Sequence, residues 1–108
     1  MKIRQWEIWK SRPPGFERDH WFVIVSGQER LDNPQHRQIN GLACFTLRGG
    51  AGKTDVRLNS ADGFMAPTAC QCDLLFFLDK TSLHSPLGIV GWERQQHIKS
   101  KLKEVFRL

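Results

Sequence analysis

The sequence predicts a mainly β protein (α+β) in which a small, strongly curved sheet is followed by one C-terminal α-helix. Short runs rich in β-branched and aromatic residues recur along the chain, and glycine, proline and asparagine separate them. Only the stretch from residue 93 to residue 108 carries apolar residues at helical spacing. The length of 108 residues, of which 40% are hydrophobic, suits a single globular domain spanning residues 1–108.

The first expected strand covers residues 4–10. Its side chains alternate, with Trp6 and Ile8 on one face and Glu7 and Trp9 on the other. Most tryptophans in proteins pack in cores or interfaces, and we expect Trp6 in the core. Trp9 is a candidate for a groove or a contact between subunits.

The second expected strand covers residues 20–26 and is apolar from Trp21 onward, as expected of a strand that is buried on both faces. A polar loop precedes this strand and places four functional side chains against its start: Glu17, Arg18, Asp19 and His20. Functional groups on a loop that a rigid strand supports are a common site architecture. Trp21 is a second candidate for a groove or subunit contact.

Three further strands are expected at residues 41–47, 55–58 and 69–78, of which the last is the most apolar. Polar or glycine-rich loops are expected between them, at residues 27–40, 48–54 and 59–67. Residues 80–87 are expected to hold one helical turn. The glycine-rich loop carries Arg48 and Lys53, which are well placed to contact phosphate groups.

The expected helix runs from Glu93 to Leu108. Its apolar side chains fall at positions i, i+4, i+7 and i+8 and form one stripe: Ile98, Leu102, Val105 and Phe106. Gly91 is suitably placed to be the N-cap, and the acidic Glu93 suits the first turn.

The charge balance suits a polyanionic partner, either RNA or an acidic protein segment. The chain has 16 Lys and Arg residues against 11 Asp and Glu residues, a formal net charge of +5. Five of the basic residues lie on the expected helix, where they also suit its solvent-exposed face. No apolar run approaches the roughly 20 residues that span a bilayer, and residues 1–4 are not followed by the apolar stretch of a signal peptide. We therefore expect a cytoplasmic protein with no membrane segment.

The three cysteines, Cys44, Cys70 and Cys72, are expected to be reduced thiols in the core. Cys70 and Cys72 point to the same side of one strand, which is poor geometry for a disulfide between them. No histidine stands nearby at metal-ligand spacing, so we expect no metal site.

Short motifs along nearly the whole chain resemble those of the MazF/PemK-type toxins, the toxin halves of bacterial toxin–antitoxin pairs. The matching segments are Glu7-Ile8-Trp9, Gly15-Phe16-Glu17, Val23-Ile24-Val25-Ser26, Ala43-Cys44-Phe45-Thr46, Cys72-Asp73, Leu78-Asp79-Lys80 and Gly88-Ile89-Val90.

The resemblance implies the CcdB/MazF-type fold, a small curved SH3-like half-open barrel with a C-terminal α-helix. It implies an endoribonuclease that cuts single-stranded RNA without metal or other cofactor and leaves a 2′,3′-cyclic phosphate. It also implies a homodimer that holds RNA in a groove across its interface, and a cognate antitoxin whose acidic tail blocks that groove.

The resemblance also assigns roles to particular residues. Thr46 matches the family's active-site threonine near the scissile phosphate, and Glu17 matches a loop glutamate that is a candidate general base. His20 stands where the family has its catalytic arginine, so we expect proton transfer from His20 and positive charge from Arg18. RNA contacts are expected from four further residues: Arg48, Lys53, Gln71 and Asp73.

Three departures from the family pattern leave a second interpretation open. His20 replaces the arginine, Gln71 replaces an arginine of some members, and Leu74 replaces the glutamine of the C-D-Q motif. These changes favour a non-catalytic binding protein on the same barrel, either an RNA or peptide binder or a CcdB-like gyrase inhibitor. The tail, residues 105–108, does not resemble the CcdB ending. If His20 is catalytic, the carboxylates of Glu17 and Asp19 are expected to favour its protonated form.

Overall fold

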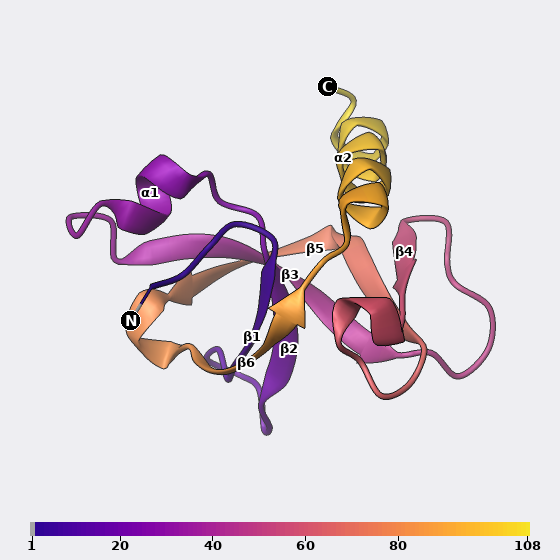
Figure 1. Ribbon diagram of the computed structural model, residues 1–108, viewed down its shortest axis with the longest axis horizontal. Coiled ribbons are helices and arrows are strands. Elements are labelled where there is room, and N and C mark those ends of the chain that lie inside the picture. Colours follow the sequence, from indigo (N-terminus) through magenta and orange to yellow (C-terminus); the bar gives the residue numbers. More distant parts are fainter. Residues whose placement is uncertain (1) are drawn as a thin grey trace.

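The computed structural model describes residues 2–108, which form one curled antiparallel sheet and two helices (Figure 1). The strands are β1 (Glu7–Ser11), β2 (His20–Ile24), β3 (Gln38–Thr46), β4 (Asp55–Leu58), β5 (Thr68–Asp79) and β6 (His84–Ile89). Their order across the sheet is β4-β5-β3-β2-β1-β6, and each neighbouring pair is antiparallel. The expected mainly β half-barrel with a C-terminal helix is confirmed.

The curled sheet buries side chains on both faces. On β1, Ile8 belongs to one buried apolar cluster, called the first cluster below, and Trp9 belongs to another, called the second cluster. The alternation of the sequence predicts this division. On β2, Val23 joins the first cluster, whereas Phe22 and Ile24 join the second. Trp6 lies in the first cluster as expected. Trp9 is only 5% exposed within the chain, so it is a core residue and does not contribute to a groove.

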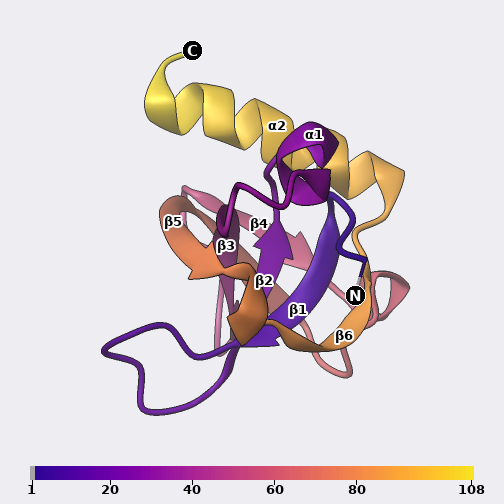
Figure 2. The ribbon, with the colours of Figure 1, turned by 90° about the vertical axis from the view of Figure 1, so that its left-hand side faces the viewer.

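Helix α2 (Trp92–Phe106) packs on β4 and β5 and lies across the top of the half-barrel (Figure 2). Ile98 is fully buried and Leu102 packs against the first cluster, which confirms the inner half of the predicted stripe. Phe106, at the outer end of the stripe, is 47% exposed. Gly91 is the N-cap residue and Glu93 lies in the first turn, both as expected.

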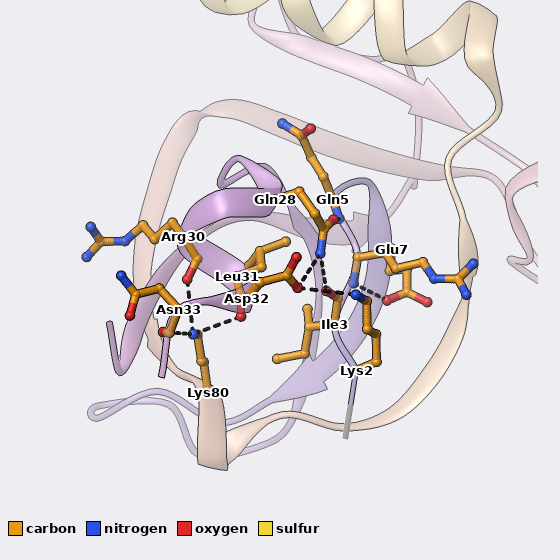
Figure 3. Close-up of polar contacts among 11 residues, drawn as sticks. Lys2, Ile3, Gln5, Glu7, Gln28, Arg30, Leu31, Asp32, Asn33 and Lys80 are labelled. Atoms are coloured by element: carbon orange, nitrogen blue, oxygen red, sulfur yellow. Dashed lines mark hydrogen bonds and ion pairs between the residues drawn. The ribbon is translucent and has the colours of Figure 1, made fainter. Parts of the chain in front are cut away.

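The segment expected to be a loop at residues 27–40 contains a short helix, α1 (Gln28–Asp32), and β3 begins at Gln38. Tertiary contacts hold this helix in place (Figure 3). The Lys80 ammonium donates to the carbonyl oxygens of Arg30, Leu31 and Asn33 at 2.9–3.1 Å, which satisfies acceptors at the helix C-terminus. The Gln28 amide donates to the carbonyl oxygen of Ile3 at 2.9 Å and joins α1 to the N-terminal segment.

The interval expected to hold one helical turn, residues 80–87, contains both that turn and a strand. The turn is a 3₁₀ helix, η2 (Lys80–Ser82), and β6 follows it and pairs with β1. β6 is a polar edge strand that includes Pro86, a residue that edge strands tolerate because it has no N–H to donate. Ser85 adopts a positive φ of 51°, and the register with β1 shifts between Ile8 and Lys10. An irregular polar strand of this kind has no alternating apolar pattern to reveal it.

Candidate functional site

One end of the sheet forms a cleft of about 580 Å³ between β2, β3 and the loop that precedes β5. Four of the residues singled out in the sequence line it: Arg18, His20, Thr46 and Arg48. Strand pairing explains why they meet. β2 and β3 are antiparallel with Trp21 opposite Cys44, so the start of β2 and the end of β3 lie at the same edge of the sheet. Two residues far apart in the sequence, His20 and Thr46, are thereby brought into one cleft.

Two aromatic side chains hold the His20 ring. Its centroid lies 4.8 Å from that of Phe16, in an edge-to-face arrangement, and 5.2 Å from that of Phe45. Within residues 2–108 no protein group forms a hydrogen bond with the ring nitrogens of His20. The packing therefore orients the ring, and His20 lines both the cleft and a second opening beside it.

The two neighbouring carboxylates are placed differently from the expectation. Asp19 contacts His84, with 3.1 Å between Oδ2 and Nε2, and thereby joins the loop before β2 to the start of β6. Glu17 does not line the cleft. It lines a second opening, of about 400 Å³, that also includes Arg18 and His20. The Asp19 carboxylate is therefore held by His84, and Glu17 lines the opening beside the cleft.

The other three expected RNA contacts lie outside the cleft. Lys53 is exposed in the glycine-rich turn, and Asp73 is exposed on β5. Gln71 is half-buried on β5 opposite Asp55. Its neighbours Cys70 and Cys72 both point into the first cluster, so the Gln71 side chain leaves the other face of the strand.

Four apolar residues form a wall of the cleft: Trp21, Phe64, Met65 and Leu87. Trp21 is half-buried and lines the cleft, and a groove was one of the two places that the sequence left open for it. The sequence did not single out the other three. Phe64 packs edge-to-face on Trp21 with 6.4 Å between ring centroids, and the available signal was the pair Phe64-Met65, two large apolar residues in a segment with no others.

The three cysteines are free and buried. Cys44 and Cys70 face each other across β3 and β5. The neighbouring thiol of Cys44 and burial raise the pKa of Cys70, and the thiol of Cys70 together with burial raises the pKa of Cys72. Such thiols stay protonated and are poor nucleophiles and metal ligands. Among residues 2–108 no group of three or more His, Cys, Asp or Glu side chains is arranged to hold a metal ion. In the same part of the chain, neither helix has the length and apolar character that crossing a bilayer requires.

No protein-family model matches the chain, and no curated protein matches its sequence. Solved structures do match its fold. A mycobacterial endoribonuclease in complex with its cognate antitoxin superposes with a TM-score of 0.78 at 17% identity, covering 99% of this chain and 95% of that one. The Mycobacterium tuberculosis toxin MazF-mt6 superposes with a TM-score of 0.78 at 16% identity, covering 94% of this chain and 97% of that one. MazF in a MazE–MazF complex from Deinococcus radiodurans gives 0.77 at 13% identity, covering 98% and 96%.

The chain has the MazF fold. In each of these three comparisons the similarity extends over more than nine-tenths of both chains. Within the MazF fold of this chain, the motifs found in the sequence occupy defined positions. Glu7-Ile8-Trp9 opens β1, and Val23-Ile24 ends β2. Thr46 is the last residue of β3.

Proposed function

We propose that the protein is the toxin of a toxin–antitoxin pair, and that it cuts single-stranded RNA in the cytoplasm without a metal ion. The observation that carries this proposal is the convergence of His20, Arg18, Thr46 and Arg48 on one cleft of a MazF fold. The cleft combines two permanent positive charges, a hydroxyl and a group that can transfer protons near neutral pH. These are the groups that cleavage of a phosphodiester by its own 2′-hydroxyl requires.

The reaction follows from those groups. The 2′-oxygen attacks phosphorus, the bond from phosphorus to the 5′-oxygen breaks, and a 2′,3′-cyclic phosphate remains. A base must take the 2′-hydroxyl proton, an acid must protonate the leaving 5′-oxygen, and positive charge must stabilise the phosphorane oxygens. His20 transfers a proton, Arg18 and Arg48 supply charge, and the Thr46 hydroxyl donates to a phosphate oxygen. Glu17 is the candidate for the second proton-transfer group because it shares an opening with His20 and Arg18.

Partners follow from the exposed surface. Lys53, Gln71 and Asp73 stay candidates for contacts with RNA beyond the cleft. The net charge of +5 suits both RNA and the acidic tail of an antitoxin, and several structures that share the fold are complexes with an antitoxin. Exposed apolar side chains on β5 and at the end of α2 support a homodimer: Leu75, Phe77, Phe106 and Leu108.

The test is incubation of the purified protein with single-stranded RNA in the presence of EDTA. We expect cleavage with 2′,3′-cyclic phosphate ends, identified by mass spectrometry of the fragments. His20→Ala should abolish cleavage, and His36→Ala, which changes a histidine in the loop before β3, is the matched control. RNA that binds but stays intact would replace the proposal with the non-catalytic binding protein.

A further inference from the structure

Met65 is the most exposed large apolar residue among residues 2–108, with a relative accessibility of 104%. It lies in the loop Asn59–Pro67 and lines the cleft that holds His20 and Thr46. Its neighbour Phe64 is only 5% exposed and packs against Trp21. The loop therefore inserts one apolar residue into the core and presents the next one to solvent at the edge of the cleft.

The loop is firmly anchored, so the position of Met65 is defined. Asp62, in the 3₁₀ helix η1 (Ser60–Asp62), is 1% exposed and accepts hydrogen bonds from the backbone N–H of Asn59 at 3.0 Å and of Gly91 at 2.8 Å. Arg94 of α2 adds an ion pair, with Nε 2.7 Å from Oδ2 of Asp62.

The far end of the loop is anchored as well. The Thr68 hydroxyl donates to the carbonyl oxygen of Ala66 at 2.9 Å, and the Leu47 N–H donates to that of Pro67 at 3.0 Å. Met65 is therefore exposed although hydrogen bonds anchor the loop on both sides of it.

The residues that line the cleft are of two chemical kinds. Arg18, Arg48 and Thr46 offer positive charge and a hydroxyl, which suit a phosphate. Met65 and Trp21 line the same cleft and offer an apolar surface with a polarisable sulfur. Lys10 lies over the Trp21 ring, with Nζ 4.9 Å from the centroid. A ligand that matches both kinds of residue carries an anion and a flat apolar ring a short distance apart, and a nucleotide has this structure.

We propose that Met65 is a specificity-determining residue that stacks on the base of the nucleotide adjoining the cleaved phosphate. This inference rests on the proposed function, because it places the base next to the phosphate that His20 and Thr46 contact. The wall offers surface rather than an array of hydrogen-bond donors. Stacking strength therefore sets the preference, and the larger ring system of a purine is favoured over a pyrimidine at this position.

The experiment compares wild type with Met65→Ala, Met65→Leu and Ile89→Ala. Ile89 is 50% exposed on β6 and does not line the cleft, so Ile89→Ala is a matched loss of an exposed apolar side chain. Two substrates are used, which differ only by a purine or a pyrimidine beside the mapped cleavage site. Met65→Ala should raise KM for the purine substrate roughly tenfold. Its kcat should change little, its preference for purine should be lost, and Met65→Leu should retain most of the wild-type behaviour.

A binding measurement separates this inference from the proposed function. The probe is a short single-stranded DNA that contains the fluorescent base 2-aminopurine. Because DNA lacks the 2′-hydroxyl, the probe cannot be cut. Its fluorescence should be quenched by wild type and by Ile89→Ala, and much less by Met65→Ala. If wild type binds this probe through Met65 but cuts no RNA, the stacking surface stands and the endonuclease proposal falls.

Three results would overturn the inference. Cleavage by Met65→Ala with unchanged KM and unchanged base preference would remove Met65 from base recognition while leaving the endonuclease intact. A change of molecular mass in Met65→Ala, measured by light scattering, would assign Met65 to a contact between copies of the chain. If wild type neither binds the probe nor cuts RNA, both proposals fail.

Discussion

His20 shows how packing can prepare a side chain for chemistry. Phe16 and Phe45 contact its ring from two sides, and neither can form a conventional hydrogen bond with it, so orientation is fixed without occupying the ring nitrogens. An imidazole held in this way can accept or donate a proton at a bound phosphate. The arginine that the resemblance places here would supply charge alone.

The first prediction concerns the chemistry at this position. His20→Ala should lower kcat at least about a hundredfold, the usual scale for loss of a general acid or base. His20→Arg should recover part of the activity through charge. Its rate should vary less with pH than that of wild type, because an arginine stays charged where an imidazole loses its proton. The measurement is kcat against pH for all three proteins, and wild-type activity in His20→Ala would move the chemistry to Arg18 and Glu17.

The second prediction uses two threonines that face each other across β3 and β5, Thr46 and Thr68. Thr46 is exposed in the cleft, so Thr46→Val should reduce cleavage and leave the free energy of unfolding unchanged. Thr68 is 5% exposed and its hydroxyl donates to Ala66. Thr68→Val should therefore lower the free energy of unfolding by about 1 kcal/mol. Urea unfolding and RNA cleavage of both variants give the comparison, and equal cleavage by Thr46→Val and wild type would exclude Thr46 from the chemistry.

At the level of single residues, the sequence predicted the positions that pairing of regular strands brings together. The pairing of β2 with β3 places His20 and Thr46 at one edge of the sheet. Arg18 and Arg48 lie two residues from them in the sequence and line the same cleft. Of the apolar wall, Trp21 was a candidate, whereas the part formed by Met65 could not be predicted, because the exposure of Met65 depends on the contacts of Asp62 with Gly91 and Arg94. The position of Gln71 could have been predicted from the sequence. Cys70 and Cys72 on either side of it lie in the core, so its side chain lies on the other face of the strand.

The elements that the sequence missed depend on tertiary contacts. α1 has five residues and buries only Leu31, which is too short for an apolar period to appear. β6 is an exposed edge strand whose pairing with β1 supplies its regularity. By contrast, β2 and α2 carry their patterns over their own lengths, and both were predicted.

The third prediction concerns Lys80, whose ammonium donates to three carbonyl oxygens at the end of α1 (Figure 3). Lys80→Met keeps most of the apolar stem and removes the donors. It should lower the free energy of unfolding by about 1–3 kcal/mol, because hydrogen bonds from a charged group exceed neutral ones. Lys53→Met, at an exposed turn position, is the matched control and should be neutral. Amide exchange should quicken in α1 of Lys80→Met, and unchanged protection there would contradict the role of Lys80.

The fourth prediction concerns Asp79, the N-cap of η2. The backbone N–H of Thr81 and then its hydroxyl donate to this carboxylate, at 2.9 and 2.7 Å, and lower its pKa from the ordinary value of 3.8. A carboxyl whose pKa is lowered by folding stabilises the protein above its unfolded pKa and loses that contribution as pH falls through its folded pKa. Asp79→Asn should therefore be less stable than wild type near neutral pH, and the difference should shrink below about pH 3.8. Asp73→Asn, at an exposed position on β5, is the control, and a difference between Asp79→Asn and wild type that is independent of pH would contradict this account.

For the whole molecule, the main question is which apolar surface is left over when the chain folds alone. Trp9 was a candidate for a groove or a contact between subunits, yet it is buried within the chain, and Phe76 packs against the second cluster. The surface that stays open includes Phe77, 59% exposed on β5, and Phe106, 47% exposed near the C-terminal end of α2. One exposed apolar residue needs no explanation, whereas neighbouring exposed ones are a candidate contact surface, and Leu75 and Phe77 lie two residues apart on one face of β5.

The last prediction tests that surface. Wild type should be a dimer by light scattering at micromolar concentration, and Phe77→Glu should shift it to monomer, because a charge buried at an apolar interface is strongly unfavourable. Trp92→Glu changes a residue that is 72% exposed at the opposite end of α2 and should leave the dimer intact. Circular dichroism should show both variants folded, since neither side chain is buried within the chain. If RNA lies in a groove between the two subunits, Phe77→Glu should also bind RNA more weakly than Trp92→Glu does. A monomeric wild type would remove the dimer and the shared groove together, and a dimeric Phe77→Glu would move the interface away from β5.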